Sequence, residues 1–176
     1  DKIRQLVGSY INHSKTIILA VMPARTDLEA DIALDLIKQY DPDGLRTIGI
    51  LTKVDLMNDN TDIINYLENN VSKDLRLNYG YYAVRNRTPK EAKTMTIKQG
   101  FTIEEEYFNK HPTYNKLIDK SHLGVLNLKD KLSKILVEKI KKSLPSILIN
   151  IHKNLETVNK ELLELGDRLP DSQDGK

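Results

Sequence analysis

The sequence predicts an α/β fold, in which part of a doubly wound parallel sheet with flanking helices is followed by a long helix kinked at a proline. Three observations support this prediction. Short apolar runs at 16–22, 48–51 and 80–84 alternate with stretches of helical periodicity, which is typical of parallel strands joined by helices. Each of the last two runs leads into a polar loop. The carboxyl third carries one long apolar stripe at helical spacing.

Composition excludes several functional classes. With 176 residues, 39% of them hydrophobic and 30% charged, the chain can build one core and a large charged helical surface. The formal net charge of +2 creates no strong field, so we predict no nucleic-acid partner. The chain has no cysteine, which excludes disulfides and thiolate metal sites, and its four histidines lack metal-ligand spacing. No apolar run approaches the length that spans a membrane.

The amino-terminal part predicts a helix followed by a strand, a helix and a second strand. Apolar positions recur at helical spacing in residues 2–13, and the continuous apolar run 16–22 predicts the first strand. Asp27 can cap the next helix, because a carboxylate there accepts from free amides of the first turn. Asp41-Pro42-Asp43-Gly44 then predicts a tight turn into the strand at 48–51.

The middle of the chain predicts a third strand and a short helix. Residues 80–84 form the apolar run, and the polar residues 85–89 follow it. We predict a loop at 90–100, because this segment is polar and has no period. Thr102 followed by Glu105 matches a capping box and predicts a helix start. The other predicted boundaries are a helix cap at Thr61 or Asp62 and a helix end at His111-Pro112.

The carboxyl third predicts a long amphipathic helix. Apolar residues recur over 125–144, Pro145 interrupts the pattern, and a nearly heptad stripe continues over 147–165. A proline removes one helical hydrogen bond, so we expect a kink at Pro145, and Gly166 supplies a stop. One apolar face of this length needs a cover, either from partner helices or from the chain's own core.

The segment Thr52-Lys53-Val54-Asp55 follows the second strand and predicts a guanine site. The carboxylate of Asp55 can accept from guanine N1–H and from its exocyclic amino group, whereas adenine offers an acceptor and a C–H there. The aliphatic stem of Lys53 can lie across the base. Taken alone, this pattern is also typical of a solvated strand end. The polar loop after the neighbouring strand favours the nucleotide site.

Several segments together resemble the dynamin superfamily of large GTPases, including its Mx-like branch. Asp41-Pro42-Asp43-Gly44, closely followed by Arg46-Thr47-Ile48-Gly49 and Thr52-Lys53-Val54-Asp55-Leu56, is the most specific of them. The others are residues 18–24, 80–88, 108–114 and 142–145. The resemblance implies a P-loop-type GTPase sheet, with the carboxyl-terminal half of the GTPase domain at 1–144. It also implies a bundle-signalling-type helix at 145–166 and a linker or disordered tail at 167–176.

The resemblance also assigns residues to a site. It implies nucleotide binding by Thr52, Lys53, Asp55, Asn58, Asn86, Arg87 and Thr88. Two neighbours depart from the family pattern, because Pro89 stands where relatives often carry Gln and Arg85 replaces an apolar residue. Asp27 lies where relatives place a contact across a dimer interface, so it either caps its helix or faces a partner. Pro145 becomes a hinge.

The activity implied by the resemblance belongs to a longer protein. Such a protein hydrolyses GTP with Mg²⁺ to drive self-assembly and membrane remodelling. This sequence contains no G-x-x-x-x-G-K-[ST] loop, so we expect the phosphate loop, the switch elements and the Mg²⁺ ligands before Asp1. We therefore predict no catalytic residue and no metal ligand here. Alone, the chain is expected neither to hydrolyse GTP nor to bind it tightly.

The implied partners are further copies of the protein, through the GTPase face and a helical bundle, and an acidic membrane. Microtubules follow from family analogy alone. The implied location is the cytoplasm, with peripheral membrane association. The lysine-rich stretch at 139–142 could attract acidic lipids, although a solvated helix face explains it more simply. Two alternatives stay open, namely a non-enzymatic assembly or interaction protein of the Mx-like antiviral type and a truncated remnant.

Overall fold

The computed structural model describes residues 2–24, 28–57 and 63–166. The chain divides into two compact units, Asp1–Asp130 and Lys131–Lys176, and each is treated by itself. Predictions that fall on Asp27, Asn58, Thr61, Asp62 and residues 167–176 lie outside the described residues.

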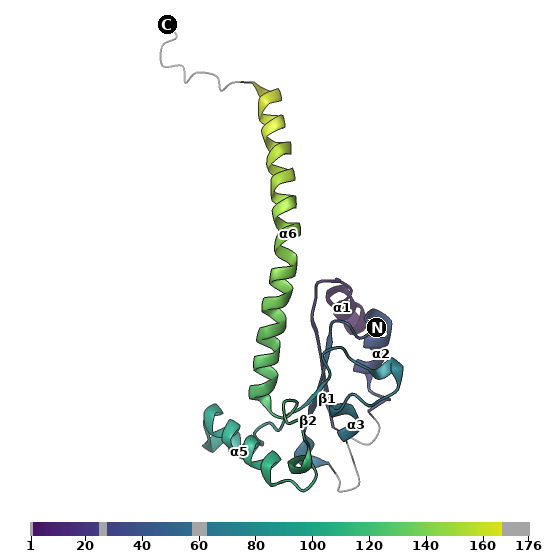
Figure 1. Ribbon diagram of the computed structural model, residues 1–176, viewed down its shortest axis with the longest axis vertical. Coiled ribbons are helices and arrows are strands. Elements are labelled where there is room, and N and C mark those ends of the chain that lie inside the picture. The colour runs from purple at the N-terminus through teal and green to yellow at the C-terminus, as the bar shows by residue number, and fades with distance from the viewer. Residues whose placement is uncertain (1, 25–27, 58–62, 167–176) are drawn as a thin grey trace. The chain divides into compact units, whose positions relative to one another are not determined.

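A three-stranded parallel sheet forms the centre of the first unit (Figure 1). Its strands are β1 (Ile18–Pro23), β2 (Thr47–Thr52) and β3 (Tyr81–Ala83), in that order. The register pairs Met22 with Leu51 and Leu51 with Ala83. The predicted α/β fold with parallel strands is therefore confirmed, and the three strands run out at one edge of the sheet.

Burial differs between the two longer strands. In β2 every residue except Thr52 is buried, and both Ile48 and Leu51 are 0% exposed. In β1 only alternate residues are buried, and Leu19 and Val21 are 45% and 59% exposed. The continuous apolar run of β1 therefore has only one covered face in the part of the chain that the structure describes.

Helices α1 (Lys2–Ile11), α2 (Ile32–Tyr40) and α3 (Ile64–Leu67) belong to the amino-terminal part of this unit. Figure 1 shows them grouped to the right of β1 and β2. The carboxylate of Asp31 caps α2 by accepting from the N–H of Ala33 at 2.9 Å. The predicted cap at Asp27 lies four residues upstream, outside the described residues, and Asp31 fills that role for α2.

The predicted loop at 90–100 is wrong, because two helices occupy most of it. Helix α4 (Pro89–Thr94) begins at a capping box in which Thr88 and Glu91 satisfy each other's backbone N–H groups. Helix α5 (Ile97–Lys110) begins at a second box, formed by Thr96 and Gln99. The predicted helix start at 102–105 lies inside α5. The predicted helix end is confirmed at His111, the C-cap.

One hydrophobic core joins the sheet to these helices. It contains the fully buried Met22 and Tyr81 from the sheet, Leu34 from α2 and Phe108 from α5. Tyr81 also donates from its hydroxyl to the carbonyl of Leu75 at 2.6 Å. The core therefore holds β2 and β3 in place next to the edge at which their loops emerge.

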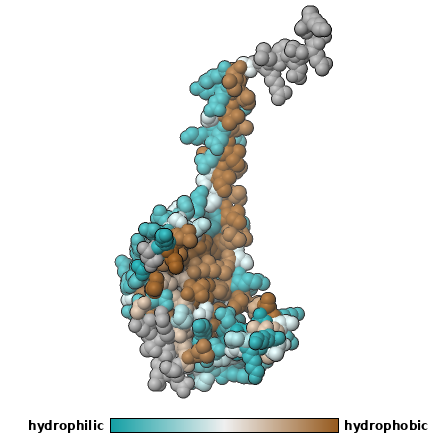
Figure 2. Space-filling model, turned by 180° about the vertical axis from the view of Figure 1, so that it is seen from behind, coloured by the Kyte–Doolittle hydropathy of each residue, from teal (hydrophilic) through white to brown (hydrophobic). Residues whose placement is uncertain are grey.

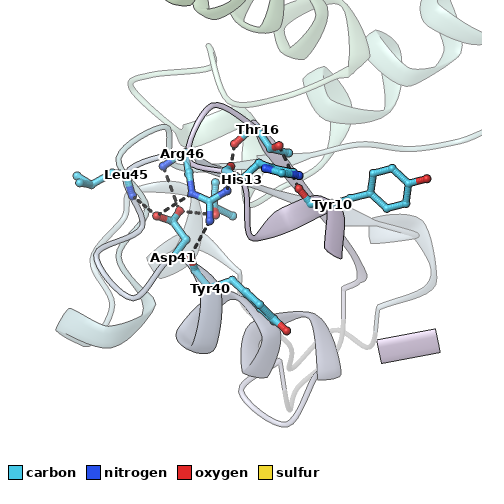
Figure 3. Close-up of polar contacts among 8 residues, drawn as sticks. Tyr10, His13, Thr16, Tyr40, Asp41, Leu45 and Arg46 are labelled. Atoms are coloured by element: carbon cyan, nitrogen blue, oxygen red, sulfur yellow. Dashed lines mark hydrogen bonds and ion pairs between the residues drawn. The ribbon is translucent and has the colours of Figure 1, made fainter. Parts of the chain in front are cut away.

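A buried carboxylate organises the turn that leads into β2 (Figure 3). Asp41 accepts from the backbone N–H groups of Leu45 and Arg46 at 3.2 and 3.0 Å. It also accepts from the hydroxyl of Thr47 at 2.6 Å. The side chain of Asp41 is only 6% exposed, so these three donors replace the water that the charge has lost.

The guanidinium of Arg46 ties this turn to two other segments. It donates to the carbonyl oxygens of His13 and Thr16 at 3.1 and 3.2 Å and to that of Tyr40 at 2.6 Å. Its Nε lies 3.8 Å from the carboxylate of Asp41. In Figure 3 these groups converge on Arg46, which thereby links α2 and β2 to the segment before β1.

Helix α6 (Val125–Leu165) begins in the first unit, and it forms the described part of the second unit. Pro145 lies inside this helix without ending it, and Gly166 follows at a φ of +78°. An apolar stripe runs along α6 (Figure 2). Within residues 131–166 its exposed members include Ile140, Leu144, Ile147, Ile151, Leu155, Val158 and Leu162.

No helix within the described residues is both long enough and apolar enough to cross a membrane.

Replacing Asp41 with Ala should lower the free energy of unfolding by about 3 kcal/mol, because Arg46 would lose its counter-charge and three donors their acceptor. The exposed Asp43 lies in the same turn, and D43A should change stability by less than about 0.5 kcal/mol. Urea unfolding of both variants measures the difference. Equal stability of the two variants would contradict the role given to Asp41.

Candidate functional site

The two predicted base-side loops leave the sheet at the same edge. The N–H of Val84, just after β3, donates to the carbonyl of Leu51 near the end of β2 at 2.9 Å. Because β2 and β3 are parallel and hydrogen-bonded up to this point, residues 53–55 and 85–88 emerge next to each other. This confirms the expected neighbourhood of the loops, and in open α/β sheets such an edge is where ligands bind.

The first loop turns sharply as it leaves β2. Lys53 has a φ of +57°, in the left-handed region, and a short 3-10 turn, η1 (Val54–Leu56), follows it. Val54 inserts into the core, and its carbonyl accepts from the hydroxyl of Tyr107 at 3.0 Å. The turn therefore leaves Lys53 exposed and Asp55 partly exposed.

An ion pair joins the first loop to the second. The Nε of Arg85 lies 3.9 Å from Oδ2 of Asp55, and the two side chains are 11% and 17% exposed. Arg85 also donates from Nη2 to Oε1 of Glu91 at 2.8 Å. Its guanidinium carbon lies 6.0 Å from the ring centre of Tyr107, at the limit of a cation–π contact. Sequence reasoning singled out Arg85 as a departure, but it missed this pairing.

One donor of Arg85 is left over. Its Nη1 is buried and has no hydrogen-bond partner within the part of the chain that the structure describes. An unpaired buried donor costs roughly 1–3 kcal/mol. The position of Arg85 is therefore set by its other contacts rather than by full satisfaction of its own hydrogen bonds.

The second loop is held by contacts of its own side chains. Arg87 donates from Nη1 to the carbonyl of Met95, and its stem packs so closely on Gly100 that an added Cβ would lie 2.8 Å from Cδ of Arg87. The hydroxyl of Thr88 accepts from the N–H of Glu91 at 3.2 Å. Asn86 is exposed. Of this predicted triplet, Asn86 therefore faces solvent, while Arg87 and Thr88 shape the loop.

The departure at Pro89 has a structural reason. Pro89 is the first residue of α4, a position at which the missing N–H of proline breaks no helical hydrogen bond. Its ring also presets the backbone for the helix that Thr88 caps. The residue is exposed, and its role in the structure is to begin α4.

Glu104 links the second loop to the long helix, which sequence reasoning missed. The residue is 3% exposed, and its carboxylate accepts from the N–H of Arg85 at 2.7 Å through Oε1. Through Oε2 it accepts from the N–H of Val125, the first residue of α6, at 2.8 Å. No periodic signal could have revealed these contacts, because they join residues 19 and 21 positions apart.

Two carboxylates of this region have altered pKa values. The hydrogen bond from Arg85 lowers the pKa of Glu91 to about 2, with help from the N–H of Thr88. Burial raises the pKa of Glu104, and the two backbone donors oppose that effect. The hydrogen bond to Glu91 raises the pKa of Arg85, so its guanidinium stays charged.

Within the residues that the structure describes, no group of three or more His, Asp or Glu side chains could hold a metal ion.

Comparison with known proteins decides the family. Residues 62–176 match the model of the dynamin central region. The chain belongs to the dynamin family. Residues 1–54 match a second model, described as dynamin family. In this dynamin-family chain, Thr52 and Lys53 fall in one matched region and residues 86–88 fall in the other.

The dynamin-family relatives come from plants, amoebae and animals. Dynamin-related protein 3B of Arabidopsis thaliana is 40% identical over 94% of this chain. Dynamin-A of Dictyostelium discoideum is 36% identical over 100% of the chain, and human Dynamin-2 is 36% identical over 97%. The chain covers 21%, 20% and 19% of these three relatives, so it spans about a fifth of their length.

The lowered pKa of Glu91 predicts a pH dependence. A carboxylate with a lowered pKa in the folded state stabilises fully above its ordinary value of 4.5, and this stabilisation is lost as the pH falls toward about 2. The free energy of unfolding should therefore fall more steeply with acid in the wild-type chain than in E91Q. NMR titration of the Glu91 side chain measures the midpoint directly. A midpoint near 4.5 would contradict the Arg85–Glu91 contact.

Proposed function

We propose that this chain carries the guanine-recognition half of a dynamin-like large GTPase. The observation that carries the proposal is the position of Asp55, a partly exposed carboxylate at the end of β2, beside the loop that follows β3. A carboxylate there can accept two hydrogen bonds side by side, and guanine presents two donors in that arrangement. The match of residues 1–54 and 62–176 to the dynamin family supports the dynamin-like part of the proposal.

The residues at this edge would contact the base of the nucleotide. Asp55 would accept from N1–H and from the exocyclic amino group of guanine, and the exposed Lys53 would lay its stem along the ring. Asn86 is exposed on the neighbouring loop, while Arg87 and Thr88 would contribute by holding that loop in shape. We retain Asn58 as a residue near the ribose, although it lies outside the described residues.

The phosphate end of the site would come from the rest of the longer protein. This sequence contains no Gly-Lys-Ser or Gly-Lys-Thr, the residues with which such proteins hold phosphate and Mg²⁺. In that protein, hydrolysis of GTP bound with Mg²⁺ would drive self-assembly and membrane remodelling. By itself the chain would neither hydrolyse GTP nor bind it tightly, and its own task would be to select the base.

The exposed apolar stripe of α6 supports a role in assembly. A lone amphipathic helix of this kind is unstable in water, so we propose that helices outside this chain cover it. Pro145 inside α6 would act as the hinge, and Asp27 would face a second GTPase domain. An acidic membrane would be the surface on which a cytoplasmic protein of this kind assembles, and a role on microtubules rests on family analogy alone.

A second candidate is a non-enzymatic assembly protein, as in the Mx-like branch. The observation that favours it is the same exposed stripe of α6, because apolar packing against partner helices does not require a nucleotide. The two candidates differ in whether GTP controls assembly. Light scattering of the longer protein with and without GTP separates them, because assembly that ignores GTP supports the second candidate.

The guanine assignment predicts that D55N changes base selectivity in the longer protein. The amide keeps the size of the side chain but donates where the carboxylate accepted, so GTP affinity should fall about 10-fold to 100-fold. Affinity for xanthosine triphosphate should rise, because its 2-oxo group accepts that donor. D43N, an exposed residue away from the site, serves as the control. Unchanged guanine selectivity in D55N would overturn the assignment.

A further inference from the structure

Arg85 is held in place by three separate contacts. Its Nη2 donates to Glu91, its Nε lies 3.9 Å from Asp55, and its guanidinium approaches the ring of Tyr107. Its backbone N–H is also fixed, by the buried carboxylate of Glu104. The side chain is therefore anchored by Glu91 from α4 and by Tyr107 from α5, while Asp55 contacts it from the loop that follows β2.

The orientation of Asp55 decides what a carboxylate there can read. To take two neighbouring donors of one base, both oxygens must lie in the plane of that base. An unrestrained carboxylate could rotate and satisfy only one donor. The cation of Arg85 opposes that rotation by attracting Oδ2. At 3.9 Å the contact is too long for a hydrogen bond, so the lone pairs of Asp55 stay available to a ligand.

Arg85 itself is not placed to touch the base. Nη2 donates to Glu91, and Nη1 is buried. We propose that Arg85 is a positioning residue, which holds the Asp55 carboxylate in the orientation that distinguishes guanine from hypoxanthine. Hypoxanthine keeps N1–H and lacks the 2-amino group. The proposal rests on the proposed function, since it assigns a role within the same site.

Glu91, which accepts from Arg85, is itself held in place. Glu91 accepts from Arg85 through Oε1 and from the N–H of Thr88 through Oε2 at 2.8 Å, so the capping box of α4 fixes the guanidinium. The second loop therefore determines the orientation of the carboxylate on the first. Glu104 extends this set of contacts to the N–H of Val125 at the start of α6.

The test compares GTP with inosine triphosphate, which carries hypoxanthine, as substrates or ligands of the longer protein. Wild type, R85M, D55N and the double variant are measured, and the ratio of the two affinities is the readout. We expect R85M to reduce the preference for GTP about 10-fold, and we expect R85M to have no further effect on the ratio in the D55N background. R76M is the matched control, because Arg76 is exposed and donates to the carbonyl of Val71.

A purely structural role for Arg85 would give a different pattern. R85M would then weaken both nucleotides alike and leave their ratio unchanged, which would overturn the proposal while leaving the guanine site intact. Equal effects of R85M with and without D55N would also overturn it. An unchanged ratio in D55N alone would instead contradict the proposed function.

The variant R85K keeps the test available if R85M does not fold. Lysine preserves the charge, but it lacks the planar guanidinium with which arginine contacts Glu91 and Asp55 at the same time. We therefore expect R85K to give a ratio between those of wild type and R85M. A wild-type ratio in R85K would show that charge alone suffices and would overturn the orienting role.

Discussion

The parallel pairing of β2 with β3 is the constraint on which the site depends. Because Leu51 pairs with Ala83, and Val84 then bonds back to Leu51, both strands end at one edge and their polar loops meet there. Without that register, Asp55 and Arg85 would not face each other across 3.9 Å. The core beneath, with Tyr81 and Leu51 fully buried, keeps the register fixed.

Much of this arrangement could be predicted from local sequence. The three apolar runs became three parallel strands, and the loops that follow two of them emerged together. In residues 88–100, the polar composition was given more weight than two helix-capping patterns. Thr88 with Glu91 and Thr96 with Gln99 are capping boxes that start α4 and α5, although the polar composition of 90–100 favoured a loop.

The contacts that tie the site together could not be predicted in this way. Arg85 lies far along the chain from Asp55, and no periodic pattern marks a pair brought together by two strands. The burial of Glu104 is even harder to predict from sequence, because a single acidic residue on a polar helix is normally solvated. Its burial depends on tertiary packing, which places the backbone N–H groups of Arg85 and Val125 around one carboxylate.

The central claim is that Asp55 reads a guanine base at this edge. Its most direct test is a crystal structure of the longer dynamin-family protein with GDP. The account predicts both oxygens of Asp55 within about 3 Å of N1 and of the exocyclic nitrogen, with the stem of Lys53 along the ring. A base bound away from Asp55, with that carboxylate in contact with Arg85 alone, would contradict it.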